Sequence, residues 1–115
     1  MSRSDELFAQ AKKVIPGGVN SPVRAFRAVG RNPLFIQKGH QDLIQDVDGK
    51  EYLDYVMSWG PLVLGHARQE VLEVVTRAVQ NGLTFGAPTQ RETELAEEIC
   101  GAGEYLEQVR LVNSG

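Results

Sequence analysis

Hydrophobic residues recur at helical spacing at the start of the chain. Ser4 precedes Asp5 and Glu6, a pattern typical of a helix start, because a serine can cap free N–H groups and the helix dipole favours acidic residues in the first turn. Pro16-Gly17-Gly18 ends the pattern. The sequence therefore predicts a first helix that begins at a Ser4 cap and ends before Pro16. Its apolar stripe is Leu7, Phe8, Ala11, Val14 and Ile15.

Two further helical patterns occupy the second half of the chain. Residues 68–80 place apolar side chains on one face and stop at Asn81-Gly82, which predicts a helix with a buried face. Thr89 has the capping-box spacing to Glu92 and predicts a helix that Gly101 and Gly103 end. The apolar positions are Val71, Val74, Val75, Ala78 and Val79 in the first of these helices, and Leu95, Ala96, Ile99 and Cys100 in the second. Cys100 is therefore expected to be a core thiol.

Short runs of β-forming residues lie between the helical segments. Asp48-Gly49 separates two such runs and predicts a two-residue hairpin turn, which would place Ile44 opposite Leu53. A strand is predicted at residues 34–37, followed by a turn at Lys38-Gly39. Two strands alone are marginal, so we expect the hairpin to pack on a neighbouring element.

Two segments show neither the helical nor the strand pattern, and each carries one side chain with distinctive chemistry. Residues 19–33 are rich in turn formers and predict an irregular surface segment that contains Arg24. Arg24 is either a solvated charge or a planar donor that can bind a carboxylate through two hydrogen bonds. Trp59, in Ser58-Trp59-Gly60-Pro61, either fills a local core or lines a site. Taken singly, Arg24 is best explained as a solvated charge and Trp59 as a residue that fills a local core.

Composition narrows the class of protein. The 115 residues are 42% hydrophobic and 23% charged, which suits one domain with a modest core. Twelve basic against fifteen acidic residues, with no basic cluster, argue against nucleic-acid binding. One cysteine and two histidines provide neither a disulfide framework nor zinc-ligand spacing. The chain shows no signal peptide or membrane-spanning run, so we expect a cytoplasmic protein without membrane contact.

The last residues have the pattern of an anion site. Residues 109–112 predict a strand that leads into the polar turn Asn113-Ser114-Gly115. A strand, such a turn and a following helix together hold phosphate on backbone N–H groups. Without the helix, this ending is weak evidence by itself.

Three stretches, read together with the closing VRLVNSG, carry a resemblance that spans almost the whole chain. They are PGGVNSPVRAF at 16–26, DVDGKEYLDYVMSWGPLVLGHA at 46–67 and LTFGAPTQRETELAEEI at 83–99. They resemble the N-terminal part of the glutamate-1-semialdehyde aminomutases, within the class III pyridoxal-phosphate-dependent aminotransferase family. The hairpin and the loop after it are shared widely in that family, whereas VNSPVRAF and SWGP are more particular to the aminomutases.

The resemblance implies an α/β fold, the N-terminal part of a fold type I transferase that uses pyridoxal 5'-phosphate. Residues 1–66 would be the N-terminal helix, arm and hairpin segment of the small domain, and residues 67–115 would start the large cofactor-binding domain. The implied reaction is isomerisation of glutamate-1-semialdehyde to 5-aminolevulinate in tetrapyrrole synthesis, by a homodimer with glutamyl-tRNA reductase as a candidate partner. Family members run to several hundred residues, so the chain is expected to be an inactive N-terminal fragment without the Schiff-base lysine.

The resemblance also implies roles by position. Arg24 would bind the substrate carboxylate with Ser21 nearby, Trp59 would line the substrate pocket, and Ser114 and Gly115 would bind the cofactor phosphate. The four lysines of the chain are expected to be solvated surface residues, so no catalytic residue is expected in it. Two alternatives stay open: another class III aminotransferase that releases a keto product, and a non-catalytic interaction module built on the hairpin and two helices.

Overall fold

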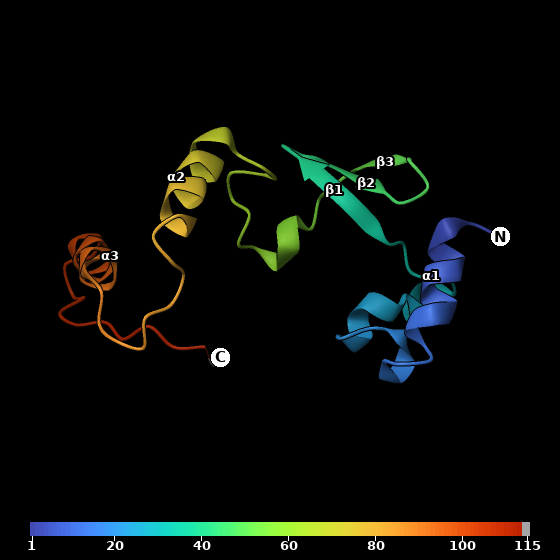
Figure 1. The fold of residues 1–115 in the computed structure, drawn as a ribbon, viewed down its shortest axis with the longest axis horizontal. Helices are drawn as coiled ribbons and strands as arrows, with labels where there is room; N and C mark the ends of the chain where they lie inside the picture. Colours follow the sequence, from blue (N-terminus) through green and yellow to red (C-terminus); the bar gives the residue numbers. More distant parts are fainter. Residues whose placement is uncertain (114–115) are drawn as a thin grey trace. The chain divides into compact units, whose positions relative to one another are not determined.

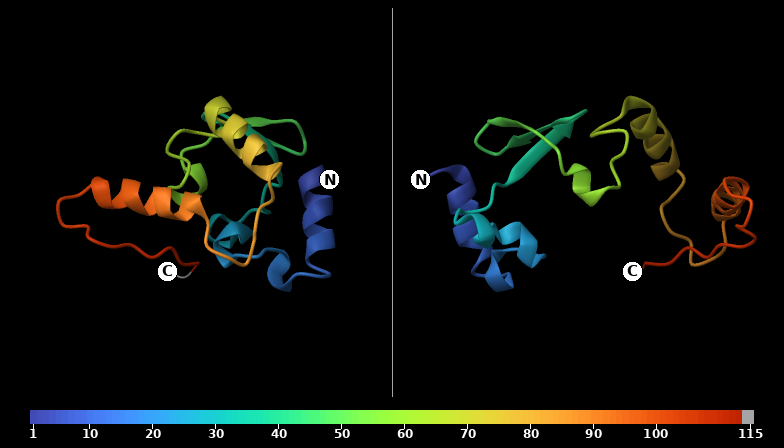
Figure 2. Two further views of the ribbon diagram at one scale, coloured as in Figure 1. Left: turned by 60° about the vertical axis from the view of Figure 1, so that its left-hand side comes forward. Right: turned by 180° about the vertical axis from the view of Figure 1, so that it is seen from behind.

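The structure is a computed structural model that describes residues 1–113 (Figures 1 and 2). The chain divides into two compact units, residues 1–76 and the residues from Arg77 onward. Helices and one small sheet make up its regular structure, the mixed content that the sequence predicts. Across the described residues, every helix is too short or too polar to cross a membrane.

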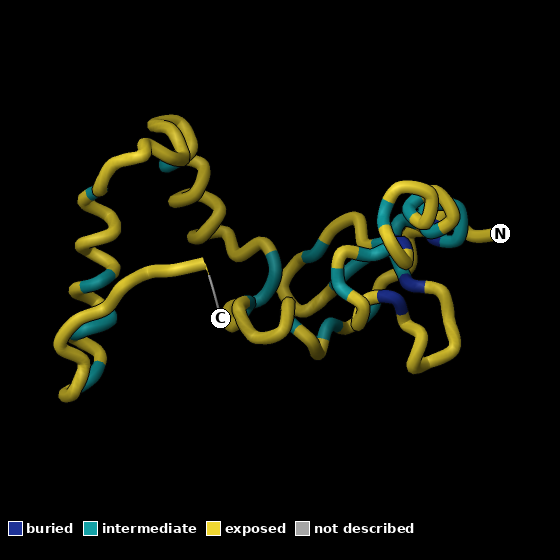
Figure 3. The backbone as a smooth tube through the Cα atoms, turned by 90° about the horizontal axis from the view of Figure 1, so that it is seen from below, coloured by how far each residue is buried: buried dark blue, intermediate teal, exposed yellow. Residues whose placement is uncertain are grey.

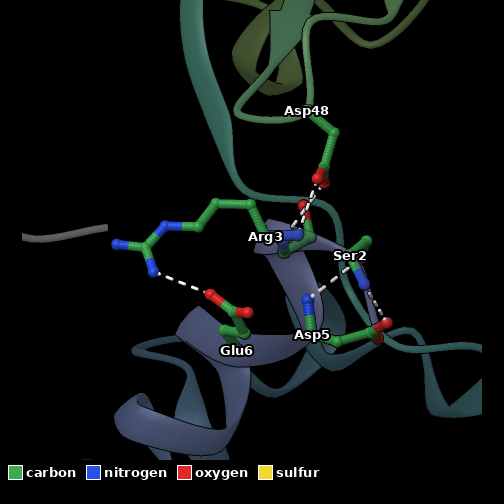
Figure 4. A network of polar contacts seen from close by, with 6 residues as sticks. Ser2, Arg3, Asp5, Glu6 and Asp48 are labelled. Carbon is green, nitrogen blue, oxygen red and sulfur yellow. Dashed lines mark hydrogen bonds and ion pairs between the residues drawn. The ribbon is translucent and has the colours of Figure 1, made fainter.

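Helix α1 spans Arg3–Ala11 and is capped by Ser2. The Asp5 N–H donates to Ser2 Oγ at 3.2 Å, and the Ser2 N–H donates to the Asp5 carboxylate at 3.1 Å, as Figure 4 shows. The prediction of Ser4 as the cap was wrong, because Ser2 offers the same oxygen two residues earlier. The helix also ends earlier than predicted, since Pro16 requires an extended residue before it and Ile15 has φ −124° and ψ 123°.

The hairpin turn holds the start of α1. The Asp48 carboxylate accepts from the N–H of Arg3 at 2.6 Å (Figure 4). It also accepts from the N–H of Ser4 at 3.1 Å. Ser4 is only 3% exposed, and its Oγ accepts from the Phe35 N–H at 3.2 Å. A carboxylate at a helix N-terminus both satisfies free N–H groups and complements the dipole. The helix and the turn are therefore joined through polar contacts rather than through a large apolar interface.

The segment after α1 is irregular, as predicted, and forms three short 3₁₀ turns: Pro16–Gly18 (η1), Pro22–Ala25 (η2) and Arg27–Val29 (η3). Within residues 1–113 the buried positions are few, and all lie in the first unit (Figure 3): Ser4, Gly18, Ala25, Pro33 and Asp46. The described residues therefore bury far fewer side chains than the modest core that the sequence predicts.

Three antiparallel strands form one sheet in the order β1, β2, β3, spanning Ile36–His40, Leu43–Asp46 and Glu51–Leu53 (Figure 1). The predicted strand at 34–37 was displaced, and the predicted turn at Lys38-Gly39 was wrong, because both residues lie inside β1. Gly39 is in the strand for a packing reason: a Cβ atom there would lie 2.6 Å from Cγ of His66.

The hairpin predicted at Asp48-Gly49 is present, but its loop contains the three residues 47–49. Gly49 takes the left-handed conformation, φ 86°, that closes a three-residue loop. The extra loop residue shifts the pairing by one, so that Ile44 faces Tyr52. The predicted pairing of Ile44 with Leu53 was therefore wrong.

The Asp46 carboxylate, 2% exposed, builds this loop. It accepts from the Asp48 N–H at 3.0 Å, the Lys50 N–H at 2.9 Å and the Tyr52 hydroxyl at 2.8 Å. Burial alone would raise the pKa of Asp46, but the hydrogen bonds from Tyr52, Lys50 and Asp48 outweigh it and hold the pKa below its usual range. The bond to Asp46 also raises the pKa of Tyr52.

Helix α2 spans Gln69–Val79, within one residue of the prediction at each end. The chain leaves it through Gly82, which has φ 94°. The face that the sequence marks as buried is open within the described residues. Its valines at 71, 74, 75 and 79 are 47–51% exposed.

Helix α3 spans Gln90–Gly101, and Thr89 caps it by accepting from the Glu92 N–H at 3.4 Å. This confirms the predicted start and end of the helix. Cys100 is half-buried rather than in a core. The predicted strand at 109–112 was wrong for this structure, because these residues are irregular and find no strand to pair with in the part of the chain that is described.

Candidate functional site

The η2 turn brings Ser21 and Arg24 together. The Arg24 N–H donates to the Ser21 carbonyl at 3.0 Å, and Ala25 anchors the turn at 6% exposure. The Arg24 side chain is exposed, and no hydrogen bond or ion pair engages its guanidinium among residues 1–113. The turn therefore fixes the backbone of Arg24 and leaves its five donors available to a ligand.

Trp59 lies on a strained turn. It ends the 3₁₀ turn Met57–Trp59 (η4), in which Met57, Ser58 and Trp59 have φ angles of 47°, 55° and 66°. The left-handed conformation costs a non-glycine residue about 1–2 kcal/mol, and such residues cluster at functional sites. The Trp59 side chain is 70% exposed, so the local-core alternative is wrong within the described residues.

The loop that carries Trp59 is closed at its base by Asp54 and His66. Nε2 of His66 lies 2.7 Å from Oδ2 of Asp54. The other carboxylate oxygen, Oδ1, accepts from the N–H of Val56 at 2.8 Å and of Met57 at 3.1 Å. The hydrogen bond from His66 and those from Val56 and Met57 hold the pKa of Asp54 below its usual range, against the effect of burial.

Backbone pairing completes the base of the loop. Gln41 and His66 exchange two hydrogen bonds, of 2.8 Å from the Gln41 N–H and 2.7 Å from the His66 N–H. Gly65 has φ 82°, and a Cβ atom there would lie 2.7 Å from the Gln41 carbonyl oxygen. Residues 54–66 thus form a compact loop with adjacent ends, a type that is frequently functional. Sequence reasoning missed Asp54 and His66; the available signal was an aspartate and a histidine that bracket a loop interrupted by Gly60-Pro61 and Gly65.

The predicted site residues are only partly assembled in this structure. Arg24 and Trp59 lie on separate turns of the first unit, and no hydrogen bond or ion pair between residues 1–113 links these turns. Ser114 and Gly115 lie outside the described residues.

The side chains suit binding more than covalent chemistry. All four lysines are exposed, and the amino groups of Lys12 and Lys50 lie 4.6 and 5.0 Å from the ring centres of Phe8 and Tyr52. A Schiff-base lysine is normally desolvated. Over the range that the structure covers, no group of histidine, cysteine and acidic residues could hold a metal ion. The arrangement thus offers a guanidinium and an indole for recognition.

Comparison with known proteins extends this description. The family model for class-III aminotransferases matches residues 26–115. The chain is 60% identical over 113 residues to the glutamate-1-semialdehyde 2,1-aminomutase of Syntrophomonas wolfei, covering 98% of this chain and 26% of that protein. It superposes on an omega-transaminase from Sphaerobacter thermophilus with a TM-score of 0.89 and 37% identity, over 99% of this chain and 25% of that one. A transaminase with pyridoxal phosphate bound gives a TM-score of 0.87 and 37% identity, over 97% and 26% of the two chains. The chain therefore spans about a quarter of the length of the relatives it matches.

Proposed function

This chain belongs to the class-III aminotransferase family, and on that premise we propose that it forms the N-terminal quarter of a glutamate-1-semialdehyde aminomutase. The full-length protein would isomerise glutamate-1-semialdehyde to 5-aminolevulinate in tetrapyrrole synthesis. The observation that carries the proposal is the 60% identity to an aminomutase across 98% of the chain. In this role the chain supplies substrate recognition rather than the reactive lysine.

Arg24 is the proposed clamp for the substrate carboxylate. Its guanidinium is exposed and without a side-chain partner in residues 1–113, while its backbone is fixed by η2. A planar guanidinium can bind both oxygens of a carboxylate, which fixes orientation as well as affinity. Ser21 lies one turn away and would add a hydroxyl to the same subsite. Trp59 would supply the flat apolar wall, since its indole is 70% exposed on a turn of defined shape.

Pyridoxal phosphate is the proposed cofactor, and it supplies an electron sink at the substrate carbon that carries the amino group. Ser114 and Gly115 are proposed to bind its phosphate through their position after residues 109–112. Residues 1–66 would belong to the small domain and residues 67–115 to the large one. We further propose a cytoplasmic homodimer, with glutamyl-tRNA reductase as a candidate partner.

A second candidate function is an intermolecular transaminase, favoured by the likeness to the omega-transaminase fold. The test uses the purified full-length protein with its cofactor and glutamate-1-semialdehyde. An aminomutase forms 5-aminolevulinate without any amino acceptor. A transaminase instead needs an acceptor and releases a keto product, and acceptor-dependent turnover without 5-aminolevulinate would overturn the proposal.

The non-catalytic module makes a different prediction for the isolated 115-residue chain, which should then unfold cooperatively on heating. We expect no sharp transition, because the apolar face of α2 is open and the buried positions are few. Circular dichroism during a thermal scan measures this directly. A cooperative transition with low dye binding to exposed apolar surface would favour the module.

A further inference from the structure

The loop of residues 54–66 is tied together at its base by two independent sets of contacts. One is the backbone pairing of Gln41 with His66. The other is the side-chain contact of 2.7 Å between Asp54 and His66, whose side chains are 9% and 19% exposed. At the start of the loop, the Asp54 N–H also donates to the Asp42 carbonyl at 2.8 Å. The two ends of the loop are therefore held to the hairpin and to each other.

The same carboxylate reaches into the strained turn. Oδ1 of Asp54 binds the N–H groups of Val56 and Met57, while Oδ2 binds His66. Met57 is the first of the three successive left-handed residues that end at Trp59. A conformation of this kind persists only where the surrounding contacts over-determine it. Among residues 1–113, Asp54 is thus the one side chain whose hydrogen bonds connect the base of the loop to the turn that presents the indole.

His66 is held in one orientation as well. A Cβ atom on Gly39 would lie 2.6 Å from its Cγ and 2.7 Å from its Nδ1, so the ring packs directly on the strand backbone. A carboxylate can only accept, so the Nε2–H group of His66 is the donor to Asp54. Ring and carboxylate are consequently fixed relative to each other before any ligand binds.

We propose that Asp54 and His66 are positioning residues that set the orientation of Trp59 against the substrate, without touching the substrate themselves. This inference rests on the substrate role proposed for Trp59. Small displacements of a group that orients substrate lower turnover steeply, so loosening the pair reduces kcat/KM although both residues lie outside the reacting atoms.

The test is a double-mutant cycle in the full-length holoenzyme, with kcat and KM for glutamate-1-semialdehyde as readouts. His66→Leu removes the donor but keeps volume against Gly39, and we expect about a tenfold loss of kcat/KM. His66→Gln keeps an N–H donor for Asp54 and recovers activity to within about threefold of the parent. His40→Leu is the matched control, because His40 is exposed on β1 and its side chain makes no hydrogen bond within residues 1–113.

The decisive comparison is His66→Leu in a Trp59→Ala background. If the pair acts through the indole, the second substitution costs less than about twofold there, because the group it orients is gone. A full tenfold cost in that background, or parent-like activity of His66→Leu alone, overturns the inference. Should His66→Leu fail to fold, Asp54→Asn enters the same cycle, since it removes the charge and keeps the shape.

The cycle separates this inference from the function on which it rests. If Trp59→Ala alone leaves kcat/KM unchanged while 5-aminolevulinate is still formed, the substrate role of Trp59 is wrong and the positioning role falls with it. If no 5-aminolevulinate is formed by the parent, the proposed function itself is wrong. A loss on Trp59→Ala together with no loss on His66→Leu refutes the positioning role alone.

Discussion

Gly39→Ala tests the contact on which the Trp59 loop is built. The added Cβ would lie 2.6 Å from Cγ, 2.7 Å from Nδ1 and 3.0 Å from Cβ of His66. Carbon atoms pack at about 3.5–4.0 Å, so the ring must retreat by about 1 Å. These atoms are close to the backbone, so a simple change of rotamer does not relieve the contact.

The expected cost combines two effects. Overpacking of this size destabilises by about 1–3 kcal/mol, and a hydrogen bond to a charged group that is stretched rather than lost forfeits part of about 1.5–3 kcal/mol. We therefore expect the local opening free energy of the loop base to fall by about 2 kcal/mol, which speeds amide hydrogen exchange there about 30-fold.

The assay is native-state hydrogen exchange in the full-length protein, at the N–H groups of Gln41 and His66, which pair with each other's carbonyls. Gly101→Ala is the control, because within residues 1–113 no atom outside the adjacent backbone of α3 lies within 4 Å of the Cβ it would add. Its exchange at Gln41 and His66 should match that of the parent. Rates in Gly39→Ala within about threefold of the parent would refute the close packing of His66 on β1.

Three further predictions concern other contacts. The pKa of Asp54 is lowered in the folded state, so its contribution to the loop base is complete above the usual aspartate pKa of about 3.9 and is lost as the pH falls through the lower folded value. The protection of the His66 N–H, which is the intrinsic exchange rate at a given pH divided by the observed rate, should therefore fall only in that acid window. Asp48→Ala removes the acceptor of two α1 N–H groups and should weaken the hydrogen-exchange protection of the first turn of α1 by about 1 kcal/mol. Asp42→Ala is the control, because it removes an exposed side chain without such bonds and should leave that protection unchanged. Arg24→Ala should raise KM for glutamate-1-semialdehyde about 10–100-fold. Arg24→Lys should raise KM by an intermediate factor, because lysine keeps the charge but loses the bidentate geometry. Equal KM values for the parent and the alanine variant would contradict the role of Arg24 as a carboxylate clamp.

Local chemistry determined which parts of the fold could be predicted. The end of α2 and both ends of α3 follow from a capping threonine and from glycines within a few positions, and the limits of both helices were predicted to within about one residue. The first helix was misplaced because Ser2 and Ser4 offer equivalent caps, and the choice depends on Phe35 and Asp48, which are distant in sequence. Burial of the α2 face depends on a partner surface, which a helical period alone does not supply.

The hairpin loop, too, could not be predicted in full from local sequence. Asp-Gly is compatible with two-residue and three-residue loops, and the Asp46 carboxylate selects the longer one by binding the N–H groups of Asp48 and Lys50. For the candidate site, Trp59 was singled out by its loop sequence, and its substrate role was implied only by the resemblance. The pairing of Asp54 with His66, twelve residues apart, was missed because it closes a loop and leaves no local period.

Asp48 belongs to the hairpin loop and also caps α1, so its contacts connect the pairing of β2 and β3 to the position of the helix. Its carboxylate meets the first turn of α1 across 45 residues of sequence, so it can do so only when the hairpin loop has brought it to the right side of the sheet. A slip of one position between β2 and β3 would turn that carboxylate away and leave two amide groups of the helix without acceptors. The two hydrogen bonds from Asp48 to α1 therefore stabilise the native pairing of the hairpin over a shifted one.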